Sequence, residues 1–146
     1  MRQTIVFAVV VLGGLSSVWA GGFGLEVRSP EASAEARAIK AVLAVQAVGC
    51  HNPAAANVSA TAIGMIQGER RTIPLKLTPL PEPGWFAVAQ QWPSEGRWVI
   101  SFIGKIEGLT TGTLVAAGPE GVDRGHRQMV MHEPTAAEVD SMLAAR

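Results

Sequence analysis

Apolar and polar residues alternate with a period of two along much of the chain. Small or apolar side chains alternate with polar ones from Val58 to Ile66, and residues 73–77 repeat the pattern after a turn over residues 67–70. This period places successive side chains on opposite faces of a β-strand, so both stretches are predicted strands. Pro74 cannot donate a backbone hydrogen bond, and we therefore expect the second strand at a sheet edge or with a bulge at its start.

Three further stretches have the composition of buried strands. Ala41 to Val48 is apolar on both faces and ends at Gly49, which predicts a central strand. Residues 85–89 and 97–103 carry a tryptophan at the first or second position and flank a turn over residues 93–96, as a hairpin would. We expect the core to be built on the side chains that share a face within these last two strands, namely Phe86, Val88, Trp98, Ile100 and Phe102.

The spacing of apolar residues changes near the end of the chain. Weaker patterns predict strands over 114–117 and at 122 or 127–131, on either side of a turn over 118–121. Thr135 and Glu138 then have the spacing of a capping box, and an apolar stripe follows over residues 139–143, so residues 135–146 are predicted to form a C-terminal helix. Short strands with no long helix between them predict an all-β protein, an antiparallel immunoglobulin-like β-sandwich over residues 40–132.

The first twenty residues have the three parts of a secretory signal: Arg2, an apolar run from Ile5 to Leu15, and Ala20 before the expected cut. An uncleaved membrane anchor is the alternative, but spanning a bilayer takes about 20 apolar residues and this run is shorter. We expect a soluble periplasmic or extracellular protein that meets the membrane only if the signal stays uncleaved. Residues 21–39 are rich in small residues and are predicted to be a flexible linker, with room for one helical turn that begins at Ser29 and Pro30.

Composition limits the function classes. Hydrophobic residues make up 48% of the 146 residues and charged residues 16%, so the chain is too apolar to be intrinsically disordered. Twelve basic residues balance twelve acidic ones and there is no tyrosine, which excludes a basic, aromatic surface for nucleic acid. Cys50 is the only cysteine, so no disulfide can form within the chain.

A resemblance to known exported modules supports the same fold. The stretch Pro83-Gly84-Trp85-Phe86-Ala87-Val88, followed by Trp92-Pro93-Ser94-Glu95-Gly96-Arg97-Trp98-Val99-Ile100, resembles the paired-strand signature of the YtkA/FixH-like group. The resemblance covers residues 73–103. It implies a small exported immunoglobulin-like β-sandwich and points to no particular ligand.

Methionine and histidine residues near the end of the chain suggest a metal site. On a strand, Met129 and Met131 share a face at about 6 to 7 Å, a spacing that lets two thioether sulfurs close on Cu(I). The third ligand would be His51 or Cys50. His126 and His132 lie six residues apart, about 20 Å along a strand, and cannot hold one ion together. The alternative interpretation is that both methionines fill a core face.

No common catalytic motif occurs in the sequence, and we expect the protein not to be an enzyme. Trp85 and Trp92 could form an aromatic surface for sugar or peptide, but tryptophans in a sandwich are more often core residues. The sequence thus predicts an exported, non-catalytic binding or assembly module without a cofactor, whose partner is another protein or an envelope component. The alternative function is copper binding through Met129, Met131, His51 and Cys50.

Overall fold

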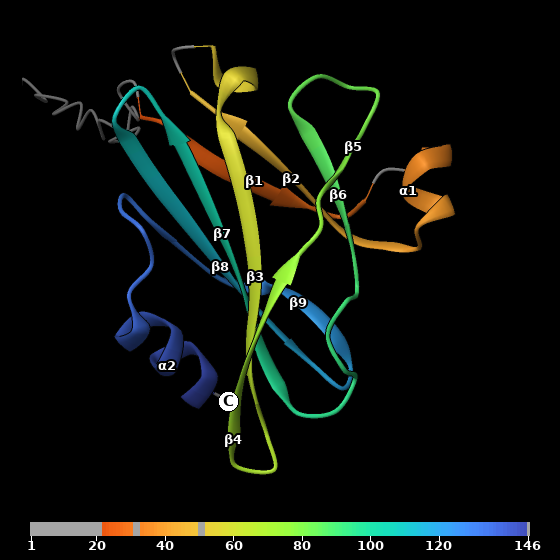
Figure 1. Ribbon diagram of the computed structural model, residues 1–146, viewed down its shortest axis with the longest axis vertical. Helices are drawn as coiled ribbons and strands as arrows, with labels where there is room; N and C mark the ends of the chain where they lie inside the picture. Colours follow the sequence, from red (N-terminus) through yellow and green to blue (C-terminus); the bar gives the residue numbers. More distant parts are fainter. Residues whose placement is uncertain (1–21, 31–32, 50–51, 146) are drawn as a thin grey trace, which may run out of the picture.

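The computed structural model describes residues 22–30, 33–49 and 52–145 (Figure 1). These residues form, in chain order, β1 (Gly24–Arg28), α1 (Ala34–Ala38), β2 (Ala41–Val48), the 3-10 turn η1 (Pro53–Ala55), β3 (Asn57–Ile66), β4 (Glu69–Leu75), β5 (Thr78–Pro79), β6 (Trp85–Ala89), β7 (Arg97–Ile106), β8 (Leu109–Gly118), β9 (Gly121–Val130) and α2 (Ala136–Ala144). None of the helices in these ranges is long and apolar enough to cross a membrane. The predicted signal over residues 1–20 lies outside the described residues.

The strands form two antiparallel sheets that pack face to face. One sheet has the order β1-β2-β6-β5 and the other the order β4-β3-β7-β8-β9. The predicted antiparallel β-sandwich is therefore confirmed. The predicted central strand, β2, lies between β1 and β6, and Pro74 lies in the edge strand β4, where its missing N–H leaves no gap in the sheet.

Alternating side chains of the two sheets build the core. Trp98, Ile100 and Phe102 project from one face of β7 and are at most 2% exposed. They belong to the same apolar cluster as Leu43 and Val45 of β2 and Val88 of β6, with Phe86 half-buried beside it. The prediction of which side chains in these two strands face the core is confirmed.

The indole of Trp98 fixes the spacing between β7 and its neighbour β3. Its cross-strand partner is Gly64, and a Cβ atom at Gly64 would lie 2.4 Å from the ring. The ring therefore rests directly on the backbone of β3, which only glycine permits. The indole Nε1 donates a hydrogen bond to the carbonyl of Glu95, 2.9 Å away, so the polar edge of the buried ring is satisfied.

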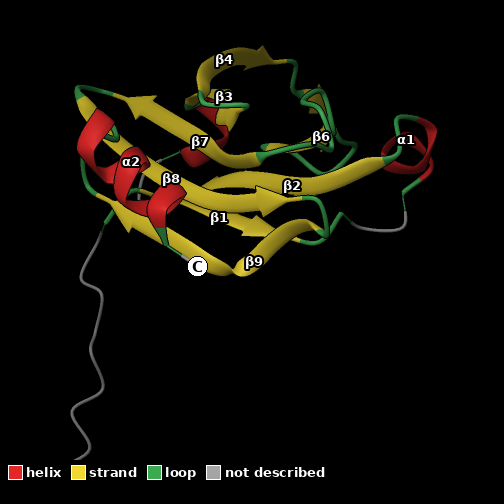
Figure 2. Ribbon diagram, turned by 90° about the horizontal axis from the view of Figure 1, so that it is seen from below, coloured by secondary structure: helices red, strands yellow, loops and turns green. Residues whose placement is uncertain are grey.

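Helix α2 covers the outer face of the second sheet. Thr135 and Glu138 form the predicted capping box, and the helix ends at Ala144. Its apolar stripe packs on the outward-facing side chains of β7 and β8, in a cluster of Val99, Leu114, Val139, Met142 and Leu143. The short helix α1 lies at the opposite end of the molecule (Figure 2). The predicted C-terminal helix is thus confirmed and is part of the folded domain.

The prediction of a flexible linker over residues 21–39 is wrong. Residues 24–28 form β1, which pairs with β2 from Gly24 opposite Val48 to Arg28 opposite Ala44, and Ser33 caps helix α1. Leu25 and Val27 are buried in the core at 1% and 3% exposure. The alternation of apolar and polar residues is present here too, but a strand of five residues between a glycine-rich stretch and Ser29-Pro30 gives a weak periodic signal.

The expected hairpin of the two aromatic-led strands is also wrong. β6 pairs with β2 and β5, whereas β7 pairs with β3 and β8 in the other sheet, so residues 90–96 cross between the sheets. Trp92 is 5% exposed and belongs to the core cluster, which holds this crossing against the core. Trp85 is 3% exposed, with the guanidinium of Arg28 stacked 3.4 Å from the ring centroid. Both tryptophans are core residues, and neither forms an exposed platform.

The buried position of Phe102 gives a direct test of this core. We expect Phe102→Ala to lower the free energy of unfolding by about 3 to 5 kcal/mol, because it leaves a cavity among residues that cannot collapse into it. Leu109→Ala, at a side chain that is 51% exposed, should change stability by about 0.5 kcal/mol or less. Urea unfolding of both variants measures the difference, and a loss below about 1 kcal/mol for Phe102→Ala would contradict the register of β7.

Candidate functional site

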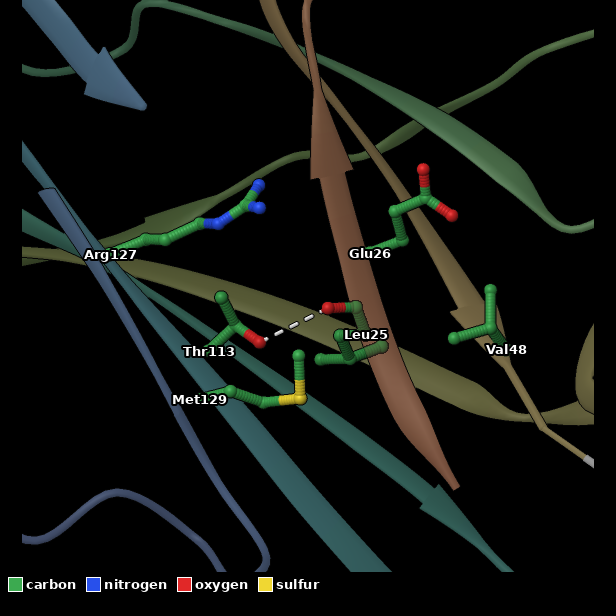
Figure 3. Close-up of a pocket in the computed structure, with 6 residues that line it drawn as sticks. All are labelled: Leu25, Glu26, Val48, Thr113, Arg127 and Met129. Carbon is green, nitrogen blue, oxygen red and sulfur yellow. Dashed lines mark hydrogen bonds between the residues drawn. The ribbon is translucent and has the colours of Figure 1, made fainter. Parts of the chain in front are cut away.

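The edge strands β1 and β9 lie on the same side of the sandwich, one in each sheet. Thr113 of β8 donates a hydrogen bond from Oγ1 to the carbonyl of Leu25, 3.2 Å away (Figure 3). Arg127 of β9 donates from Nη1 to the carbonyl of Val27, at 3.1 Å. These two side chains bond to the edge of β1 that its backbone neighbour β2 does not use. They join the two sheets along this side.

A groove of about 350 Å³ runs between these two edges. The buried side chains of Leu25 and Thr113 form its floor. Arg127 and Met129 reach toward β1 from one side, and Glu26 and Val48 stand on the other (Figure 3). The groove is thus apolar at its base, with one cation and one carboxylate at its rims.

A second cavity, of about 460 Å³, lies close by, beside the start of β1. Its lining includes Gly22 and Phe23 on one side and Leu109 on another. Met131 and His132, which follow the end of β9, also line it. Met129 thus lines the groove, and Met131 lines the second cavity.

Met129 and Met131 are surface residues, with 48% and 57% of their areas exposed. A Cβ at Gly24 would lie 3.7 Å from the sulfur of Met129, and one at Gly22 would lie 3.9 Å from the terminal methyl of Met131. Both side chains therefore lie along the same stretch of chain, at two glycines that leave room for them. The interpretation that they fill a core face is wrong, because about half of each side chain is exposed.

The imidazole of His132 is tied to the cap of helix α2. Its Nε2 lies 3.0 and 3.2 Å from the two carboxylate oxygens of Glu138. One of these oxygens also accepts hydrogen bonds from the backbone N–H and the hydroxyl of Thr135, at 2.8 and 3.0 Å. The Thr135 backbone bond has the largest effect and lowers the pKa of Glu138. Desolvation comes next and opposes it, and the Thr135 hydroxyl and His132 lower the pKa further.

His126 lies apart from this arrangement, in a bulge of β9. The register between β8 and β9 shifts from Val115 opposite Arg127 to Ala116 opposite Asp123, so residues 124–126 have no partners in β8. Asp123 holds the bulge by accepting hydrogen bonds from the backbone N–H groups of Gly125 and His126. Because of this bulge, and because β9 ends at Val130, His126 and His132 do not lie on one continuous strand face.

Of the four residues predicted to bind metal, the structure describes Met129 and Met131, and it places Met129 beside Gly24 and Met131 beside Gly22. Cys50 and His51 lie outside the described residues. Within the described ranges, no group of three or more His, Cys, Asp and Glu side chains could hold a metal ion. Sequence reasoning missed the link between His132 and Glu138, although a histidine three residues before a capping threonine was its visible signal.

The surface as described offers two thioether sulfurs and one imidazole, next to an apolar groove. Thioether and imidazole are ligands for soft or borderline metal ions, and the apolar groove suits an uncharged side chain or chain segment. Comparison of the chain with protein-family models, with curated proteins and with solved structures gave no match.

Proposed function

We propose that this protein is an exported, non-catalytic binding module that binds Cu(I) through the thioether sulfurs of Met129 and Met131. The observation that carries the proposal is the exposure of both side chains beside two glycines, Gly22 and Gly24, that are close together in the chain. Soft sulfur ligands select Cu(I) over the harder divalent ions. An accessible pair of thioethers is the part of this surface with the most specific chemistry.

Docking of a protein partner or envelope component is the second candidate for the same surface. Leu109 is 51% exposed and lines the same cavity as Met131, so exposed apolar side chains gather here. Such clustering is typical of interaction surfaces. The two candidates differ in one measurable respect, since only the first requires metal.

The non-catalytic part of the proposal rests on how the ionisable groups near the methionines are used. The Nε2 of His132 is bonded to Glu138, and Glu138 is held by the helix cap. Glu133 forms an ion pair of 2.9 Å with Lys105. These groups serve structural contacts, and a general acid or base would have to leave its partner to act.

The export part rests on the pattern of the first twenty residues. We expect the secreted form to begin at Gly21, because the small side chain of Ala20 precedes the expected cut. Intact-mass measurement of protein from the medium or periplasm checks this. A species that begins at Met1 and stays in the membrane fraction would contradict the proposal of export.

Copper binding is tested by titration under reducing conditions against a chromogenic Cu(I) chelator. We expect the double variant Met129→Leu, Met131→Leu to weaken Cu(I) binding by at least about tenfold, since leucine keeps the volume but removes both sulfurs. The matched control is Met65→Leu, which removes a partly exposed thioether elsewhere and should bind as the wild type does. Equal affinities of the wild type and the first variant would contradict the proposal and favour docking.

A further inference from the structure

We infer that His132 completes the Cu(I) site through its Nδ1 atom, and that Glu138 positions the imidazole for this role. The inference rests on the proposed function and adds a third ligand to it. It also joins the metal site to the cap of helix α2, because one carboxylate serves both.

The first step concerns which ring nitrogen of His132 is available. A carboxylate only accepts hydrogen bonds, so in a neutral imidazole the Nε2 that faces Glu138 carries the proton. The lone pair that can bind a metal is then on Nδ1. Histidine ligands in metalloproteins commonly donate their other ring N–H to a carboxylate, which fixes the tautomer and the orientation of the ring. His132 and Glu138 have this arrangement without a metal.

The second step concerns how firmly Glu138 is held. It is the third residue of α2, and its carboxylate accepts the two bonds from Thr135 while its own backbone N–H donates to the Thr135 hydroxyl at 3.3 Å. The helix behind it is anchored by buried Val139 and Met142. The Glu138 side chain is only 23% exposed, against 54% for His132. A partly covered, multiply bonded carboxylate thus orients a histidine that remains accessible.

The third step concerns the choice of His132 over the other groups nearby. Met131 and His132 line the same cavity, and Met129 lies beside Gly24, two residues from the Gly22 that Met131 adjoins. Glu133 also lines that cavity, but its hard carboxylate oxygens suit Cu(I) poorly and it pairs with Lys105. His126 lies in the bulge of β9, where Asp123 holds its backbone. His132 is therefore the nitrogen ligand that the described residues bring to the thioethers.

Binding at Nδ1 leaves the bonds of the helix cap in place. The metal takes a lone pair that no described contact uses, and the Nε2 proton stays on its bond to Glu138. A metal that binds the native arrangement also stabilises it against unfolding, and here the native arrangement includes the start of α2. Cu(I) should thus raise the thermal stability of the helix along with that of the site.

The test compares four variants in the Cu(I) competition titration. We expect His132→Gln to weaken binding by about tenfold to a hundredfold, and His126→Gln, the matched control, to leave it unchanged. Glu138→Gln should weaken binding by about tenfold, because glutamine at this position still serves the capping box but lacks the carboxylate charge. Cys50→Ser tests the thiolate that the sequence offered as third ligand, and it should bind as the wild type does.

A spectroscopic readout separates positioning of the ring from a structural role of Glu138. In the ¹⁵N-labelled wild type without metal, we expect the His132 ring to be protonated at Nε2, and the Nδ1 resonance to shift when Cu(I) is added. In Glu138→Gln the preference for this tautomer should weaken while the circular dichroism of the helix is kept. The wild-type spectrum tests the ligand role even if His132→Gln fails to fold.

The possible outcomes distinguish this inference from the proposed function. Absence of Cu(I) binding by the wild type overturns both. A loss on replacing Met129 and Met131, with unchanged affinity in His132→Gln and no shift at Nδ1, overturns the inference alone. A loss in Cys50→Ser together with wild-type behaviour of His132→Gln also overturns it, because the third ligand is then the thiolate.

Discussion

Two side-chain hydrogen bonds, from Thr113 and Arg127 to the carbonyls of Leu25 and Val27, hold β1 against the second sheet. A typical hydrogen bond contributes about 1 kcal/mol net, whereas burial of one large apolar side chain contributes about 1.5 to 3 kcal/mol. Burial of Leu25 and Val27 is therefore the larger attraction. The directional hydrogen bonds determine the position of β1 along β9. That position places Gly22 and Gly24 next to the two methionines.

The local periodic patterns of the sequence were enough to predict most of the strands and the C-terminal helix. β2, β3 and α2 follow from long apolar runs, clear alternation and a capping box, all of which depend on neighbouring residues in the chain. Which strands pair with each other depends on residues far apart in the chain, and this could not be predicted from local patterns. β6 and β7 illustrate this, because their aromatic pattern is identical in kind but their hydrogen-bonding partners lie in different sheets. A tryptophan such as Trp92 is expected in the core, but nothing in residues 90–96 indicates that this segment crosses between the sheets.

The candidate site was predictable in part for the same reason. The alternation predicts that Met129 and Met131 lie on the same face of a strand. It does not show which residues pack against that face. The neighbouring residues are Gly22 and Gly24, in a segment that the sequence pattern presented as a linker, and so the exposure of the two side chains could not be foreseen. The position of His132 depends on the end of β9 at Val130 and on the chain turning toward α2, and both are set by packing of the helix on the sheet.

The four edge strands have a consequence for how copies of this protein meet. β4 carries Pro74, β5 is two residues long and contains Pro79, β9 is interrupted by its bulge, and side chains occupy two carbonyls of β1. Each feature shortens or breaks the row of free backbone groups on which a second molecule could extend the sheet. The fold is thus built against edge-to-edge aggregation. Any specific association between copies is left to side chains rather than to the backbone of the sheet edges.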